Sequence, residues 1–135
     1  MRKVTVEEIV SLNPCSQYNE EYVEKLFNGQ KAISVQYILE LPIPKLDKIW
    51  IIDKLGLISD EAIGKIHQKL TDLITDKESA YRERFREGRI WQYAPVFRFL
   101  QETNKDYTRK FLIDFIEDLI VFLVKEELDA NTSIF

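Results

Sequence analysis

The chain contains little cysteine, glycine, proline or histidine, and each shortage excludes a class of protein. Its single cysteine, Cys15, forms no internal disulfide, so a small secreted scaffold held together by bridges is excluded. Four glycines and four prolines in 135 residues are too few for an all-β fold with many tight turns. The only histidine, His67, supplies no ligand set for zinc. We therefore expect neither a metal nor a cofactor.

Long hydrophobic runs are missing as well. The longest wholly apolar run covers the six residues 119–124, whereas a membrane-spanning helix needs about 20. Arg2 and Lys3 near the N-terminus have no apolar stretch behind them, so this segment is not a signal peptide. These features favour a soluble, cytoplasmic protein that does not enter a membrane.

Helical signals occupy most of the sequence. Thr5 and Glu8 have the spacing of a capping box, and Asn19, Ser34 and Ser59 each precede apolar residues with helical periodicity. The length suits one domain, and no repeat or linker divides it. We predict an all-α fold, a compact single-domain bundle of about six or seven short-to-medium helices. Its longest helix is C-terminal, and residues 127–135 form a loose tail.

Charge is distributed unevenly around a net value of −4. Residues 77–110 carry nine basic and five acidic groups, and six of the seven arginines lie between Arg82 and Arg109. Residues 111–135 carry one basic and six acidic groups. On a helix, Arg82, Arg86 and Arg89 share a stripe that suits an anionic partner, with Trp91 and Tyr93 close by. The alternative interpretation is a solvated helix face, which is the more common role of such charge runs.

The last predicted helix, about 106–127, carries two neighbouring apolar stripes. Phe111, Phe115, Leu119 and Phe122 share the first stripe, and Leu112, Ile116, Ile120 and Leu123 share the second. Either the helix is buried centrally in a monomer, or its uncovered side pairs with a second copy. Phe115, Leu119 and Phe122 are the residues predicted to mediate self-association, and the sequence leaves both alternatives open.

Five residues are candidates for a chemical role: three carboxylates on the last helix, Cys15 and His67. Asp114, Glu117 and Asp118 lie on adjacent turns of one helix, where a metal-dependent enzyme could use them. The more common role for such residues is the wet side of an amphipathic helix. Cys15 has no second cysteine, and His67 lies at the boundary of an apolar helix face. We predict no catalytic residue.

Four short motifs carry a resemblance. They are Leu12-Asn13-Pro14-Cys15, Leu41-Pro42-Ile43-Pro44, Asp47-Lys48-Ile49-Trp50 and Leu57-Ile58-Ser59-Asp60. Over about residues 5–70 the chain resembles small phage- and prophage-associated bacterial proteins of uncharacterised function. In these proteins a turn with the sequence Asn-Pro-Cys precedes a short helix with the pattern Asp-x-x-Trp. The resemblance implies a mobile-element context and assigns no activity and no functional residue.

The missing catalytic motifs and the uneven charge together favour one hypothesis. We expect a non-enzymatic accessory or regulatory protein that binds another macromolecule, such as an inhibitor, an immunity-type protein or an assembly subunit. The alternative is a nucleic-acid-binding protein that uses the arginine and aromatic segment 82–109. A carboxylate-based, metal-dependent enzyme is the remote alternative.

Overall fold

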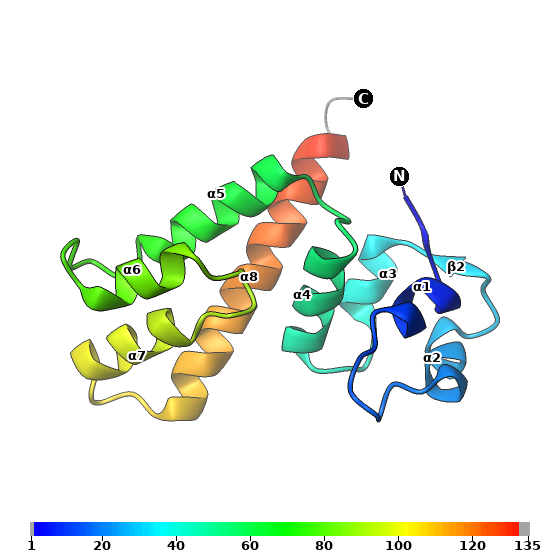
Figure 1. Cartoon of the computed structure of the whole chain (residues 1–135), viewed down its shortest axis with the longest axis horizontal. Helices are drawn as coiled ribbons and strands as arrows, with labels where there is room; N and C mark the ends of the chain where they lie inside the picture. Colours follow the sequence, from blue (N-terminus) through cyan, green and yellow to red (C-terminus); the bar gives the residue numbers. More distant parts are fainter. Residues whose placement is uncertain (1, 133–135) are drawn as a thin grey trace. The chain divides into compact units, whose positions relative to one another are not determined.

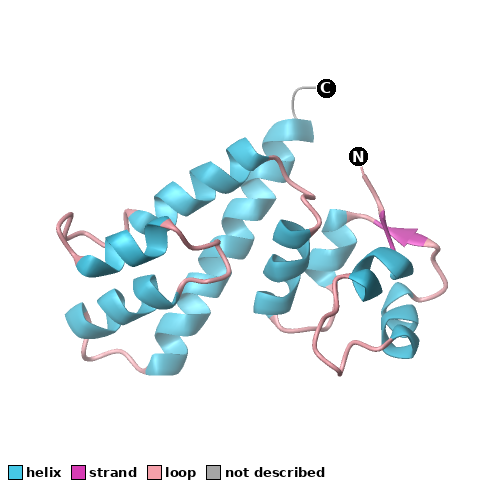
Figure 2. Cartoon of the chain, viewed as in Figure 1, coloured by secondary structure: helices cyan, strands magenta, loops and turns pink. Residues whose placement is uncertain are grey.

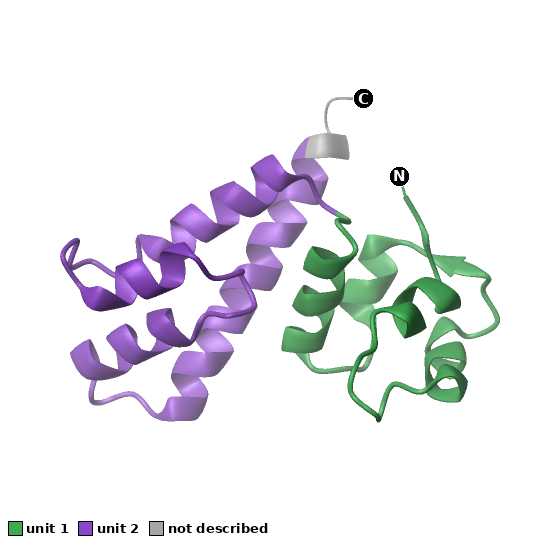
Figure 3. Cartoon of the chain, in the orientation of Figure 1, with its two compact units in different colours: residues 1–57 green, residues 58–135 purple. Residues whose placement is uncertain are grey.

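The computed structural model is mostly helical (Figures 1 and 2), which confirms the predicted all-α class. It describes the backbone of residues 2–132 and the side chains of residues 2–130. This part of the chain contains eight helices and one two-stranded ladder. The chain contains two compact units, residues 1–57 and 58–135 (Figure 3). No linker-like composition marks the boundary between Leu57 and Ile58, and the single domain expected from the sequence stays a prediction.

The first unit contains four short helices and both strands. Its elements are β1 (Val4–Thr5), α1 (Val6–Ser11), α2 (Glu20–Phe27), β2 (Ala32–Ile33), α3 (Val35–Glu40) and α4 (Lys45–Lys54). The strands pair antiparallel, with Val4 opposite Ile33 and Thr5 opposite Ala32. Sequence patterning did not predict this ladder, because alternation over two residues has no detectable period.

Side-chain caps define where the helices of the first unit begin. The Thr5 hydroxyl accepts a hydrogen bond from the Glu8 N–H while Glu8 accepts one from the Thr5 N–H, which completes the predicted capping box. At the starts of α2 and α3, the Asn19 and Ser34 side chains each accept one hydrogen bond, from the N–H groups of Tyr22 and Tyr37. The N-cap of α4 is Pro44, one position before the first helical residue.

The second unit is a group of four helices. They are α5 (Asp60–Thr71), α6 (Ala80–Arg86), α7 (Ala94–Thr103) and α8 (Arg109–Thr132). Helix α8 packs against α5 and α7, and α6 packs against α5 and α7. Ile66, Leu70, Phe85 and Ile116 are among the fully buried side chains of its core.

The C-terminal helix extends further than the sequence indicated. Residues 127–132 were predicted to belong to a loose tail, but they continue α8, and the Leu128 side chain is buried. The apolar spacing Ile120, Val124, Leu128 repeats every four residues, so the buried face of the helix continues past residue 127. Residues 133–135 lie outside the described part of the chain.

Candidate interaction surface

Four aromatic side chains are exposed at the start and along the length of α8. Tyr107, Phe111, Phe115 and Phe122 have exposed fractions of 53%, 52%, 43% and 56%. The rings of Tyr107 and Phe111 stack, with their centroids 4.8 Å apart. We call these four residues the aromatic face. Large apolar side chains are normally inside a fold, so an exposed group of them requires a physical explanation.

Helical geometry explains why these rings point outward. Leu112, Ile116 and Ile120 are buried against the rest of the second unit, so they fix the inner side of α8. At about 100° per residue, Phe111, Phe115 and Phe122 fall within an arc of roughly 40°, about 120° around the helix from the centre of the buried set. The outer side of α8 therefore carries phenylalanines among its exposed charged residues Asp118, Lys125 and Asp129.

The start of the aromatic face is held in place by a helix cap. The Phe111 N–H donates a hydrogen bond to the Thr108 hydroxyl oxygen at 3.1 Å, and the Tyr107 N–H donates to the Asn104 carbonyl. These bonds fix the turn that carries Tyr107 beside the first ring of the helix. The backbone at the start of the face is thus hydrogen-bonded within the chain itself, an arrangement that lowers the entropy cost of binding.

The predicted self-association residues differ in exposure. Phe115 and Phe122 are exposed members of the aromatic face, and Leu119 is half-buried at its edge. Their participation in self-association stays a prediction.

The arginine stripe predicted on a single helix is wrong for one of its three members. Arg82 and Arg86 lie on α6, but this helix ends at Arg86, and Arg89 belongs to the segment that follows. Glu87 is the C-cap residue, and the Gly88 N–H donates to the Phe85 carbonyl at 2.9 Å, so the chain turns before Arg89. The spacing i, i+4, i+7 aligns side chains only while the helix continues.

Several arginines of the 82–109 segment contact neighbouring side chains. Arg82 pairs with Asp72 at 3.7 Å, and Arg86 pairs with Glu83 at 3.6 Å. The guanidinium of Arg109 lies over the Phe97 ring, 5.2 Å from its centroid. Each of the two ion pairs contributes at most about 1 kcal/mol.

The two aromatic residues predicted to bind an anionic partner are only partly exposed. Trp91 is half-buried. The hydroxyl of Tyr93, also half-buried, donates a hydrogen bond to Glu117 of α8. Burial, together with this hydrogen bond, raises the pKa of Tyr93 well above its usual value. Tyr93 thus connects the start of α7 to α8, a role that no sequence pattern indicated because the partners are distant in the chain.

The residues considered for chemistry lie in separate places. His67 stacks on Phe85 with ring centroids 4.2 Å apart, and its Nε2 donates to the Phe85 carbonyl at 2.7 Å. Cys15 is exposed in the first unit. Glu117 accepts the Tyr93 hydrogen bond, whereas Asp118 is exposed. Within the described residues, no group of three or more His, Cys, Asp or Glu side chains could hold a metal ion.

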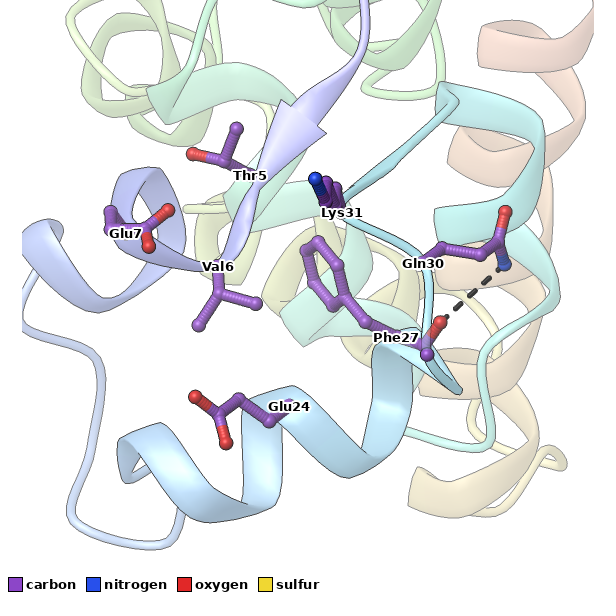
Figure 4. Close-up of a pocket in the computed structure, with 8 residues that line it drawn as sticks. Thr5, Val6, Glu7, Glu24, Phe27, Gln30 and Lys31 are labelled. Atoms are coloured by element: carbon purple, nitrogen blue, oxygen red, sulfur yellow. Dashed lines mark hydrogen bonds between the residues drawn. The ribbon is translucent and has the colours of Figure 1, made fainter.

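A surface cavity of about 530 Å³ lies in the first unit (Figure 4). Val6 and Glu7 of α1 line it together with Glu24 and Phe27 of α2, and Lys31 lies just before β2. The two carboxylates and the ammonium group are exposed, and only Phe27 is fully buried. This cavity therefore presents solvated charges over one apolar ring.

Comparison with known proteins identifies no relative of this chain. No protein-family model matches the sequence, and no curated protein or solved structure is significantly similar to it. The resemblance to phage-associated proteins stays a prediction. Among the described residues, no helix has the length and apolarity that crossing a membrane requires.

Proposed function

We propose that this protein acts by binding another protein through the aromatic face of α8, without catalysing a reaction. The observation that carries this proposal is the placement of Phe111, Phe115 and Phe122 on the outer side of a helix whose inner side is already packed. Soluble monomers rarely expose contiguous apolar patches larger than a few hundred Å². Such patches are typical of protein-protein contact sites.

The energetics of the face also favour a protein partner. Burying a phenylalanine fully contributes about 1.5–3 kcal/mol, so covering the exposed half of each ring contributes about 1 kcal/mol. Aromatic side chains have few rotatable bonds, and here a capped helix holds them, so little entropy is lost on binding. Aromatic residues are also enriched among those that dominate interface affinity.

The alternative function, nucleic-acid binding by the segment 82–109, has less support. Arg82 and Arg86 pair with carboxylates, and Arg89 does not extend their stripe. We expect fluorescence titrations with single- and double-stranded DNA and RNA at low salt to show no binding. Binding that weakens steeply with salt, and is lost on charge reversal of Arg82 and Arg86, would favour the alternative instead.

The test of the proposed function compares two variants that each add one negative charge. Phe115→Glu places the charge on the aromatic face, and Gln101→Glu places it on an exposed position of α7. Each protein is used to capture partners from cells that express it, and a partner found reproducibly is then purified for affinity measurement. We expect Phe115→Glu to weaken binding roughly tenfold or more, with Gln101→Glu close to wild type. Equal affinities of the three proteins would contradict the proposal.

A further inference from the structure

We infer that, in the absence of another partner, a second copy of this chain covers the aromatic face by antiparallel pairing of α8 with α8. This inference rests on the proposed function, because it concerns the same surface and names its occupant in the free protein. A partner protein then binds in competition with self-pairing. Three features of α8 carry the inference: the arrangement of its rings, the distribution of its charge, and the area that its rings expose.

The rings are arranged so that the face complements itself. In a two-fold contact, residue i of one copy meets residue j of the other, and j meets i. Phe111 and Phe122 are separated by about 16 Å along the helix axis. When the axis of symmetry lies midway between them, Phe111 of each copy meets Phe122 of the other. Phe115 then lies beside the axis, so all three phenylalanines are covered at once.

The charge along α8 favours the antiparallel direction. Residues 105–110, which lead into α8 and include its first two residues, carry three basic groups and one acidic group, a net charge of +2. Residues 125–129, near its end, carry one basic and three acidic groups, a net charge of −2. Antiparallel pairing brings the basic end of each copy to the acidic end of the other, whereas parallel pairing brings like charges together. Helix macrodipoles favour the same direction.

The exposed area is sufficient for association at the low end of stable interfaces. An aromatic side chain buries about 150–250 Å², so four half-exposed rings contribute roughly 400 Å² from each copy. A standard interface buries about 800 Å² per partner, so the rings alone supply about half of that area. This balance predicts a dimer of micromolar rather than nanomolar affinity, which another protein displaces readily.

Asp118 gives the antiparallel arrangement a distinctive signature. It is exposed on the same side of α8 as the rings, and in this register it lies near the symmetry axis, close to its own counterpart. Two like charges facing each other weaken the pair. Asp118→Asn removes this repulsion, so we expect the dimer to tighten about two- to fivefold at low salt. If Asp118 instead faced a basic group of its partner, Asp118→Asn would weaken binding.

The test is analytical ultracentrifugation of the full chain between about 1 and 100 µM, the range that reports a micromolar dissociation constant. The monomer mass is 16.0 kDa. We expect wild type and Gln101→Glu to dimerise alike, Phe122→Glu to dimerise roughly a hundredfold more weakly, and Asp118→Asn to dimerise more tightly. Circular dichroism checks the helix content of each variant. If Phe122→Glu loses helix content, Phe111→Gln replaces it, with the same expected direction.

Three results would overturn the inference. They are a wild-type monomer over the whole range, a dimer that Phe122→Glu leaves intact, and a dimer that Asp118→Asn leaves unchanged or weaker. These outcomes are separable from failure of the proposed function. If the wild type is monomeric but Phe115→Glu still loses the captured partner, self-pairing is rejected and the proposed function is retained. If the wild type dimerises through this face but Phe115→Glu binds the captured partner normally, self-pairing is retained and the proposed function is rejected.

Discussion

At the residue scale, tyrosine hydroxyls connect parts of the chain that are distant in sequence. Three tyrosines donate hydrogen bonds to carboxylates, and the pairs are Tyr18–Asp47, Tyr81–Glu102 and Tyr93–Glu117. Tyr18 and Tyr93 are the more buried of the three, and in both cases burial is the largest cause of the raised pKa. A buried phenol that stays protonated keeps donating its hydrogen bond, so on the tyrosine side these bonds change with pH only in alkaline solution.

The first prediction concerns stability at high pH. Because the pKa of Tyr93 is raised in the folded protein, its contribution is complete below the pKa of an unfolded-chain tyrosine, about 10. The contribution is lost as pH rises above that value, since the unfolded chain then releases the proton first. We expect the free energy of unfolding, measured with urea, to fall as pH rises above about 10. Tyr93→Phe is expected to lose about 1 kcal/mol at pH 7 and to decline less steeply. An equal decline in both proteins would contradict this role of Tyr93.

At the scale of the elements, local signals decide where helices begin, and longer-range packing decides where they end. The cap residues Thr5, Asn19, Ser34 and Ser59 were all predictable because a capping side chain bonds to a backbone N–H three residues ahead. The end of α8 was not predictable in this way, because α8 continues past residue 127, where Leu128 is packed inside.

The second prediction tests one cap. The Ser59 hydroxyl accepts a hydrogen bond from the Ala62 N–H at 3.1 Å, and it is the N-cap of the twelve-residue helix α5. We expect Ser59→Ala to lower the free energy of unfolding by about 1 kcal/mol. Ser59→Asp is the matched control, because aspartate also caps and its charge is favourable at a helix N-terminus. A Ser59→Ala protein as stable as wild type in urea denaturation would show that the cap contributes nothing.

The candidate site was predictable only in part. The sequence grouped Phe111, Phe115 and Phe122 on one stripe and Ile116 on the next, because helical spacing fixes which residues share a side. It did not decide which stripe faces the core, since both are apolar and the periodicity is satisfied by either. Only the packing of α8 against α5 and α7 shows that the phenylalanines are the outer set.

At the scale of the whole molecule, the chain consists of two compact units, each with its own buried residues. In the first unit Val23, Phe27 and Ile38 are buried, and in the second Ile66 and Phe85 are buried. The aromatic face belongs entirely to the second unit. Binding through this face therefore requires that the second unit be folded, whatever the state of the first.

The third prediction is that residues 58–135 fold without the rest of the chain. This fragment contains α5 to α8 with their shared core, and packing between helices supplies most of the stability of such bundles. Domains of about 80 residues have small cores, so we expect a low free energy of unfolding, about 3–5 kcal/mol. The measurement is cooperative loss of the helical circular dichroism signal on heating. A non-cooperative, gradual loss would show that the first unit is needed for folding.

The central claim is that the aromatic face of α8 is a protein-binding surface, and photo-cross-linking from that face tests it most directly. A photoreactive phenylalanine analogue is placed at position 115 in the full chain, and in a control protein at position 101, which is exposed on α7. Both proteins are irradiated in the cells that express them. We predict covalent protein adducts from position 115, either with a second copy or with another protein, and none from position 101. An absence of adducts from position 115, or equal yields from both positions, would contradict the claim.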